Sequence, residues 1–272
     1  MKIGLVGLGR TGKIVAEYLL HKAVLTMALC RPHSINANKD IGQILNRERT
    51  GILITSTEHL ERQLFSNKPD VLIDFSCPQF LKEHLHTLET FGIHIVTAVT
   101  GYEPAEMQRI RNIAEKERIG VVMAPNITYG VNVLMLIAEI AASLLQDYDI
   151  EIFEEHHRHK KDRPSGTAKI IAGKIKGTMG TEREIPTHAV RAGGIVGKHK
   201  VLLCSEFDKI EIGHESISRL AFAEGAYKAA QFIHGKTGFF EMSDIFAYEM
   251  KKKPWDNPDN PDDYEGLKAV PD

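Results

Sequence analysis

The stretch that decides the fold lies at the amino terminus and reads Ile3-Gly4-Leu5-Val6-Gly7-Leu8-Gly9-Arg10-Thr11-Gly12. Residues 2–7 predict a short buried strand, and residues 10–20 predict a helix that begins directly after it. The glycines between them follow the pattern G-x-G-x-x-G. In this pattern Gly7 permits the tight turn, Gly9 lets a pyrophosphate approach the backbone, and Gly12 lets the helix pack closely on the strand. The stretch therefore predicts a dinucleotide site, with a glycine-rich turn that holds no ligand as the alternative.

Strands and helices alternate beyond this stretch. Further apolar strands are predicted at 24–29, 71–75, 93–99 and 120–123, with helices near 58–65, 78–91 and 103–116. Strands that are apolar throughout are typical of a parallel sheet that helices cover on both faces. The first part of the chain is therefore expected to be an α/β domain with a Rossmann, doubly wound parallel sheet.

The second half of the chain changes character. After a helix near 132–145, strands are predicted at 149–155, 187–190, 201–205 and 207–213, with helices near 167–176 and 225–233. Several of these strands are separated by glycine-containing turns. We therefore expect an α+β domain with a mixed or antiparallel sheet.

Residues at strand ends predict which dinucleotide binds. About twenty residues beyond the glycine motif, where an acid would hold the ribose hydroxyls of NADH, the sequence has Cys30 and Arg31. Arg31 can pair with a 2′-phosphate and Arg10 can add to the same pocket, unless either is an ordinary solvated surface charge. The sequence thus favours NADPH, with NADH possible. Two later strand ends are expected beside the nicotinamide, or else are simple turns: Ala98-Val99-Thr100-Gly101 and Ala124-Pro125-Asn126-Ile127.

A second functional segment reads Glu154-Glu155-His156-His157-Arg158-His159-Lys160-Lys161-Asp162-Arg163-Pro164-Ser165-Gly166-Thr167-Ala168. Histidine is the side chain whose ordinary charge change lies closest to neutral pH, so His156 is a candidate proton donor, and the Lys160 ammonium is another. A helix is predicted to begin near Ser165, and its free N–H groups at Ser165, Gly166 and Thr167 would attract a carboxylate or phosphate.

Two alternatives remain open for this segment. It can be a charged surface strand followed by a capped helix. It can also be a metal site built on His156, His157 and His159, although no cysteine or carboxylate cluster elsewhere completes such a ligand set. We therefore expect no metal.

Composition narrows the partners and the compartment. The 272 residues carry 34 Lys and Arg against 36 Asp and Glu, so no global field favours nucleic acid or an anionic membrane. Cys30, Cys77 and Cys204 are far apart, which fits a reduced, cytoplasmic protein, and neither a secretion signal nor a membrane span is predicted. Residues 254–263, rich in Pro, Asp and Asn, are expected to be an extended or disordered tail.

Taken together, these segments resemble the dihydrodipicolinate reductase family. The main match is His-His-x-x-Lys-x-Asp-x-Pro-Ser-Gly-Thr-Ala at 156–168, with Gly-Arg-x-Gly at 9–12. Supporting segments occur in the same order, at Asp74-Phe75-Ser76-x-Pro78, Ala124-Pro125-Asn126, Gly130-Val131-Asn132-Val133, Arg191-Ala192-Gly193 and Ile195-Val196-Gly197. The segment at 156–168 is specific to this family rather than to Rossmann proteins at large.

The resemblance implies a domain organisation and an activity. It implies a dinucleotide-binding domain at 1–127, onto which 238–272 packs back, and a substrate-binding and tetramerisation domain at 128–237. The implied enzyme is a homotetramer that reduces a dicarboxylate, 4-hydroxy-tetrahydrodipicolinate, to tetrahydrodipicolinate with NAD(P)H, in the diaminopimelate and lysine pathway.

The resemblance also implies residue roles. His156 matches the family's proton donor or acceptor, Lys160 its second proton donor, and His157 a substrate contact. Gly166 and Thr167 match the carboxylate cradle.

Some positions depart from the family pattern. Ala98-Val99-Thr100-Gly101 stands where the family usually has Gly-Thr-Thr-Gly, and Cys30 stands where many members have an acid. Two other functions therefore stay open: reduction of another imine or amino-acid precursor, and a nucleotide-binding sensor without turnover.

Overall fold

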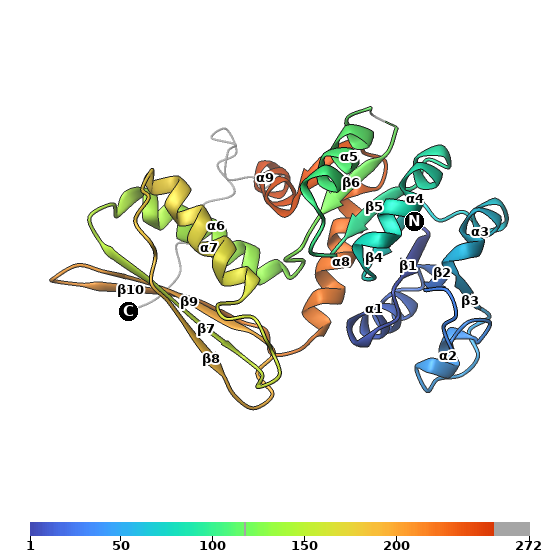
Figure 1. The fold of residues 1–272 in the computed structure, drawn as a ribbon, viewed down its shortest axis with the longest axis horizontal. Helices are drawn as coiled ribbons and strands as arrows, with labels where there is room; N and C mark the ends of the chain where they lie inside the picture. Colours follow the sequence, from blue (N-terminus) through green and yellow to red (C-terminus); the bar gives the residue numbers. More distant parts are fainter. Residues whose placement is uncertain (117, 253–272) are drawn as a thin grey trace, which may run out of the picture.

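The structure, a computed structural model, describes residues 1–116 and 118–252 and divides them into two lobes (Figure 1). The predicted tail at 254–263 lies outside the described residues. The first lobe holds a seven-stranded parallel sheet in the order β11-β6-β5-β4-β1-β2-β3. Its strands are β1 (Ile3–Val6), β2 (Leu25–Cys30), β3 (Ile54–Ser56), β4 (Val71–Asp74), β5 (His94–Thr97), β6 (Gly120–Met123) and β11 (Gly238–Glu241). The predicted doubly wound sheet is confirmed, with β3 and β11 as additional strands.

Helices cover both faces of this sheet because neighbouring residues of each strand point to opposite sides. Ile73 and Val96 pack into one apolar cluster, whereas the adjacent Leu72 and Ile95 pack into another. The first cluster lies under α1 (Arg10–His21), α8 (Leu220–Ile233) and α9 (Met242–Lys252). The second lies under α3 (Leu60–Ser66), α4 (Pro78–Thr90) and α5 (Pro104–Glu115). Two short helices, α2 (Ile41–Ile44) and η1 (Thr57–His59), complete the connections.

The strand order places a crevice next to β1. The chain begins in the middle of the sheet, moves out to β2 and β3, and then returns to pair β4 with the other side of β1. The order reverses between β1 and β4, and ligands of such sheets bind outside the carboxyl ends of the strands at this point. The glycine stretch that follows Val6 therefore lies at the expected position for a dinucleotide.

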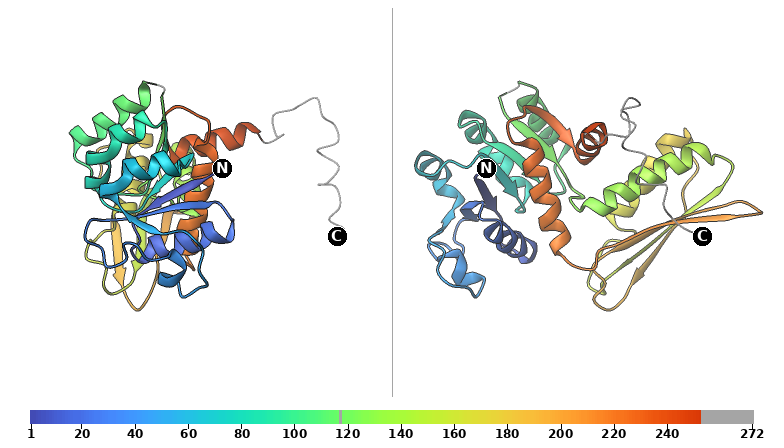
Figure 2. Two further views of the ribbon diagram at one scale, coloured as in Figure 1. Left: turned by 90° about the vertical axis from the view of Figure 1, so that its right-hand side faces the viewer. Right: turned by 180° about the vertical axis from the view of Figure 1, so that it is seen from behind.

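The second lobe is a four-stranded mixed sheet in the order β10-β9-β7-β8. Its strands are β7 (Asp149–His156), β8 (Thr187–Arg191), β9 (Lys198–Cys204) and β10 (Lys209–Glu215). Along β7 and β9 buried residues alternate with partly exposed ones, so one face packs on helices and the other faces outward. Figure 2 shows α6 (Tyr129–Leu144) and α7 (Gly166–Met179) together on the covered face.

The chain returns to the first lobe earlier than predicted. Helix α8, which the sequence analysis placed in the second domain, packs beside α1 against β4, β5 and β6 (Figure 1). Gly225 of α8 lies so close to the chain leaving β6 that a Cβ there would be 1.9 Å from the Ile127 carbonyl oxygen. The alanine-rich face of α8 suits this close packing, which was not evident from its apolar character alone. Across residues 1–116 and 118–252, no helix has the length and apolar character needed to cross a membrane.

Candidate active site

The loop after β1 has the geometry of a phosphate-binding turn. Gly7 has a φ of +91°, and a Cβ on Gly12 would lie 1.8 Å from the Gly7 carbonyl oxygen. By contrast, no heavy atom of the described residues outside its own chain neighbours lies within 4 Å of a Cβ on Gly9. Helix α1 begins at the next residue, and no side chain in the described part of the molecule caps it. The loop therefore fits a dinucleotide pyrophosphate, which would lie over Gly9 against the first N–H groups of α1.

The end of β2 lies beside this loop. The N–H of Gly7 donates to the carbonyl of Leu29 at 3.1 Å, which ties the loop to the last residues of β2. Cys30 is buried and Arg31, the next residue, is exposed. Position 30 thus offers no carboxylate for a ribose diol, and position 31 offers a cation.

A cationic cavity of about 320 Å³ lies between the lobes. Arg10 and Thr11 of the phosphate loop line it from the first lobe. The second lobe contributes the predicted residues His156, His157, Lys160 and Thr167. Its wall also includes Pro125, Asn126, Ile127, Thr128, Val131, Val196, Gly197, His199, His214, Ser216, Arg219 and Phe222. The basic segment and the dinucleotide loop, far apart in the sequence, therefore meet in one cavity.

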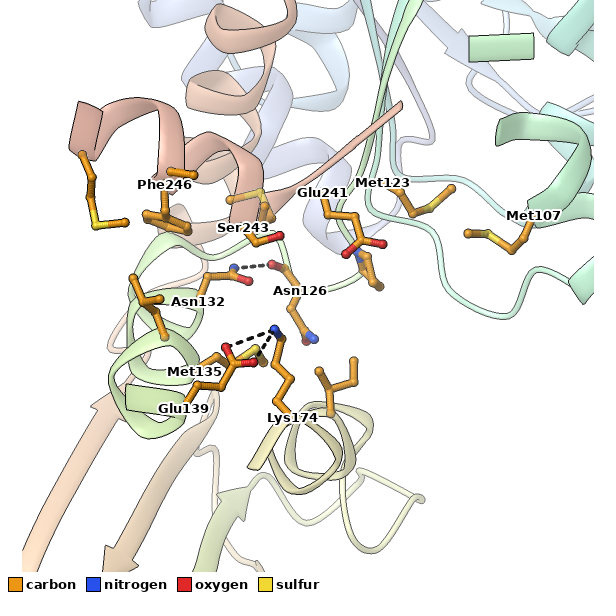
Figure 3. A pocket seen from close by; sticks show the side chains of 16 residues that line it. Met107, Met123, Asn126, Asn132, Met135, Glu139, Lys174, Glu241, Ser243 and Phe246 are labelled. Atoms are coloured by element: carbon orange, nitrogen blue, oxygen red, sulfur yellow. Dashed lines mark hydrogen bonds and ion pairs between the residues drawn. The ribbon is translucent and has the colours of Figure 1, made fainter. Parts of the chain in front are cut away.

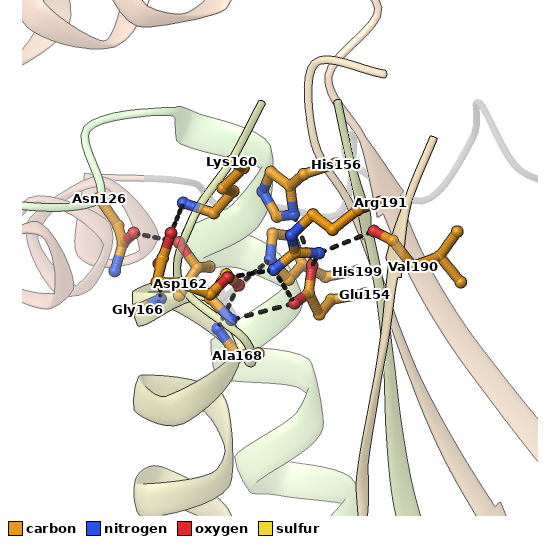
Figure 4. A network of polar contacts seen from close by, with 12 residues as sticks. Asn126, Glu154, His156, Lys160, Asp162, Gly166, Ala168, Val190, Arg191 and His199 are labelled. Carbon is orange, nitrogen blue, oxygen red and sulfur yellow. Dashed lines mark hydrogen bonds and ion pairs between the residues drawn. The ribbon is translucent and has the colours of Figure 1, made fainter. Parts of the chain in front are cut away.

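A buried carboxylate orients the basic segment (Figure 4). Glu154 is fully buried, and one of its oxygens lies 2.5 Å from Nδ1 of His156. Arg191 donates to both Glu154 oxygens, at 2.7 and 2.6 Å, and the N–H of Ser165 donates at 3.0 Å. Burial alone would raise the pKa of Glu154, but these hydrogen bonds outweigh it and the pKa lies below its usual value.

The imidazole ring of His199, which lies next to His156, is uncharged at neutral pH. Burial, with a smaller contribution from the neighbouring His156, lowers the pKa of His199 to about 4. Its Nε2 lies 3.2 Å from the hydroxyl of Ser165, and the two imidazole rings meet edge to face at 5.2 Å. Burial also lowers the pKa of His156, while the Glu154 hydrogen bond opposes that shift.

The start of α7 differs in part from the prediction. Ser165 is the N-cap, as its side chain accepts from the N–H of Ala168 at 3.2 Å. However, Ser165 is only 1% exposed and does not line the cavity, because Glu154 and His199 engage its polar groups. In this structure Ser165 therefore begins the helix, and its predicted contact with a carboxylate stays a prediction.

Two other groups at this helix start are held by a carboxylate of the protein. Asp162 lies 2.9 Å from Nζ of Lys160 and accepts from the N–H of Gly166 at 3.2 Å. The hydroxyl of Thr167 donates to the side-chain oxygen of Asn126 at 2.6 Å. Lys160, the N–H of Gly166 and the hydroxyl of Thr167, which are predicted to bind a carboxylate, thus lie close together. In this structure Lys160 and the N–H of Gly166 already bind the carboxylate of Asp162.

The predicted nicotinamide contacts separate into two places. Pro125, Asn126 and Ile127 line the cationic cavity, and Ala124 is buried at the end of β6. Ala98, Val99 and Thr100 instead line a separate hollow with residues 75–78. Both places lie at the carboxyl-terminal edge of the seven-stranded sheet.

A buried acid connects the loops around that hollow. Asp74 accepts from the N–H and hydroxyl of Ser76, at 2.8 and 2.5 Å, and from the hydroxyl of Thr97 at 3.4 Å. Thr97 in turn contacts the Tyr102 hydroxyl at 3.1 Å and accepts from the N–H of Val99. Burial raises the pKa of Asp74 to about 6, although its hydrogen bonds oppose that shift.

A second cavity between the lobes, of about 370 Å³, has a different lining (Figure 3). Methionine is the residue type that lines it most often, and Lys174 in its wall is already paired with Glu139 at 3.1 Å. Asn126 lines both cavities, and its carbonyl accepts from the side chain of Asn132 at 2.6 Å. An apolar cavity with a neutralised cation does not suit a dicarboxylate, so the cationic cavity is the candidate substrate site.

The histidine cluster does not assemble as metal ligands. Among residues 1–116 and 118–252, no three His, Cys, Asp or Glu side chains gather in a group that could hold a metal ion. His156 turns its Nδ1 to Glu154, whereas the His157 and His159 rings lie 6.3 Å apart.

Several site residues were not identified from the sequence. Glu154 stands two residues before His156, so strand periodicity alone puts both on one face of β7, and this signal was available. Arg191 lay in a quoted segment without a role. His199, His214 and Arg219 come from β9, β10 and the start of α8, and no local pattern marks them.

Comparisons with known proteins match both parts of the chain. The family model described as "Dihydrodipicolinate reductase, N-terminus" matches residues 1–127, and "Dihydrodipicolinate reductase, C-terminus" matches residues 130–246. The protein named 4-hydroxy-tetrahydrodipicolinate reductase from Ralstonia pickettii is 36% identical over 269 residues, covering 91% of this chain and 100% of that protein. Its namesake from Methanothermobacter thermautotrophicus is 36% identical over 245 residues, covering 83% and 90%.

Solved structures show the same fold. A dipicolinate-bound dihydrodipicolinate reductase from Paenisporosarcina sp. TG-14 superposes with a TM-score of 0.74 at 23% identity, covering 89% of this chain and 97% of that one. A probable dehydrogenase from Thermotoga maritima gives a TM-score of 0.60 at 12% identity, covering 90% and 92%. The family models and the curated relatives confirm the resemblance seen in the sequence: the chain belongs to the dihydrodipicolinate reductase family.

Proposed function

We propose that the dicarboxylate substrate binds in the cationic cavity and that NADPH binds along the adjoining edge of the seven-stranded sheet. As a family member the chain is an NAD(P)H-dependent oxidoreductase of the diaminopimelate and lysine pathway, which reduces 4-hydroxy-tetrahydrodipicolinate to tetrahydrodipicolinate. One observation carries the proposal. A single cavity joins Arg10 and Thr11 of the phosphate loop with His156, Lys160 and Thr167 of the basic segment.

The cations of the cavity hold the substrate. Lys160, the N–H of Gly166 and the hydroxyl of Thr167 would bind one carboxylate, in the place where Lys160 and Gly166 now contact Asp162. Asp162 must therefore give way when the substrate binds. Arg219, elsewhere in the cavity wall, would pair with the second carboxylate.

Proton delivery falls to the same segment. The 4-hydroxyl of the substrate leaves as water, and a bound nicotinamide cofactor would supply a hydride to the unsaturated ring that results. The electron-rich carbon that remains then takes a proton from His156 or Lys160, both of which line the cavity. His157 lines it as well and would contact the substrate.

The finer cofactor assignment rests on the end of β2. Arg31 follows β2 directly, and no acid stands at position 30. We propose that Arg31, with Arg10, pairs with the 2′-phosphate of NADPH, which makes NADPH the preferred cofactor and NADH the weaker one.

A homotetramer is also proposed, formed through the outer face of the four-stranded sheet. Phe153 and His188 stack on that face at 4.6 Å, Lys200 lies 5.1 Å from the centre of the Phe153 ring, and Val190 is 48% exposed. Aromatic and apolar groups among charged ones suit contact between subunits. Light scattering should give a tetramer mass, and Val190→Asp should lower it.

The three free cysteines further support a reducing, cytoplasmic compartment.

An absorbance assay of NADPH and NADH oxidation, coupled to enzymatic generation of the substrate, tests the function. We expect the protein to oxidise both cofactors, and NADPH should reach half of the maximal rate at a lower concentration than NADH. Reduction only of other cyclic imines in a panel would assign a different substrate. Binding of NADPH without oxidation across the panel would indicate a nucleotide-binding sensor.

A further inference from the structure

Glu154 is the centre of the polar network beside the cavity, although it does not line the cavity itself. It comes from β7, and its partners come from three places: His156 on the same strand, Arg191 on β8, and Ser165 at the start of α7. One carboxylate therefore ties the proposed proton donor to the helix start that would hold the substrate.

Arg191 keeps this carboxylate ionised. Its side chain is 1% exposed and that of Glu154 is fully buried, so the two charges compensate each other away from water. Arg191 also donates to the carbonyl of Val190 at 2.7 Å and to the carbonyl of Asp162 at 2.5 Å. Through the second of these bonds it reaches the loop that carries Lys160.

The contact with Glu154 decides which nitrogen of His156 reacts. A carboxylate only accepts, so Nδ1 at 2.5 Å must carry a proton, and Nε2 is left for the substrate. The backbone next to Nε2 is Gly197, where a Cβ would lie 3.2 Å from that nitrogen. Glycine at this position leaves room for the ring in this orientation.

We propose that Glu154, held by Arg191, is the positioning residue for proton transfer by His156: it directs Nε2 to the substrate and its negative charge favours the protonated, donating ring. This inference rests on the proposed function. The charged or titratable groups that act on the ring are Glu154 from β7, Lys160 from the following loop, Arg191 from β8 and His199 from β9. Glu154 is the only anion among these four, so its removal shifts the balance against the imidazolium.

Glu154→Gln tests the proposal because it keeps the shape and removes the charge. The titration of the His156 ring, followed by NMR, should move to lower pH than in the unmodified protein. The decline of kcat with rising pH should move in the same direction, and kcat at neutral pH should fall by roughly ten- to a hundredfold. KM should change less, since Lys160 and Thr167 are left in place.

Glu155→Gln is the matched control. Glu155 is the next residue of β7, points to the opposite face and lies 3.8 Å from Lys198, so the same loss of charge should leave both the titration and kcat unchanged. If Glu154→Gln fails to fold, Glu154→Asp keeps the charge beside Arg191 but is one methylene too short to hold His156, and it should lower kcat.

An unchanged His156 titration in Glu154→Gln, or an equal shift in Glu155→Gln, would overturn the proposal. Full activity of a folded Glu154→Asp would do the same. The NMR titration needs no turnover, so it tests the positioning role even if the unmodified protein fails to reduce the proposed substrate, which is the separate failure of the proposed function.

Discussion

The two lobes form their parts of the site from different groups: the first mainly from backbone, the second from charged side chains. In the phosphate loop, at the edge of the seven-stranded sheet, Gly7 and Gly12 allow close packing of the backbone, and Gly9 leaves open space. In the second lobe the site consists of side chains, with Lys160 and His156 oriented by carboxylates that the cavity does not expose. The comparison teaches that the cofactor half depends on glycines that leave space for a ligand. The substrate half depends on charged side chains that carboxylates hold in place, and the buried Glu154 among them needs its partner Arg191.

The largest effect is expected where the substrate half does chemistry. His156→Ala should lower kcat by roughly 10² to 10⁴ with little change in KM, because it removes a proton donor. Lys160→Ala should affect both kcat and KM, because it also removes a carboxylate partner. Steady-state kinetics check both, and titration should show NADPH affinity nearly intact. Unchanged kinetics in both variants would mean that neither His156 nor Lys160 takes part in turnover.

The cofactor half also contains a buried charged side chain, Asp74, so it does not consist of backbone alone. Its folded pKa of about 6 lies above the ordinary 3.8, so the folded protein binds this proton more tightly than the unfolded chain does. The contribution of Asp74 to the free energy of unfolding should therefore be fully present below about pH 4 and be lost, by about 3 kcal/mol, as the pH rises through about 6. In denaturant titrations at several pH values, Asp74→Asn should remove this contribution from the slope of the free energy of unfolding between about pH 4 and pH 6.

The exposed Asp147 supplies the control for that measurement. Asp147→Asn should leave the slope as it is. The same slope in the Asp74 and Asp147 variants would assign the pH dependence to other groups.

In the cofactor half, the proposed preference for NADPH over NADH depends mainly on one side chain, Arg31. Arg31→Ala should weaken NADPH binding by roughly tenfold or more, equivalent to about 1.5 to 3 kcal/mol for a charge-assisted pair, and leave NADH binding nearly unchanged. Fluorescence titrations with both cofactors measure this. Equal dissociation constants in the unmodified protein would refute the preference.

Two glycines test the backbone origin of the cofactor half. Gly12→Ala should destabilise the fold by about 1 to 3 kcal/mol, because its Cβ would lie 1.8 Å from the Gly7 oxygen. Gly9→Ala has open space and a φ of −71°, so it should leave the unfolding transition in place and weaken NADPH binding instead. Normal binding by Gly9→Ala would show that the pyrophosphate does not lie over this residue.

Much of the architecture could be predicted because it depends on local patterns. Apolar strands, the glycine loop and the Pro-Ser-Gly-Thr helix start are each written in consecutive residues, and the parallel sheet follows from their alternation. The position of α8 could not be predicted, because an apolar helix can cover either lobe and its choice depends on close contacts such as Gly225 against Ile127.

The site divides in the same way. The sequence by itself determined that His156, Lys160 and Thr167 belong together, since they lie within twelve residues on one strand end and one helix start. Only the tertiary structure decided that Arg191 neutralises Glu154 and that Ser165 is buried, because those contacts join strands and helices up to 37 residues apart. A buried charge needs its partner in space, and sequence spacing does not encode which distant residue provides it.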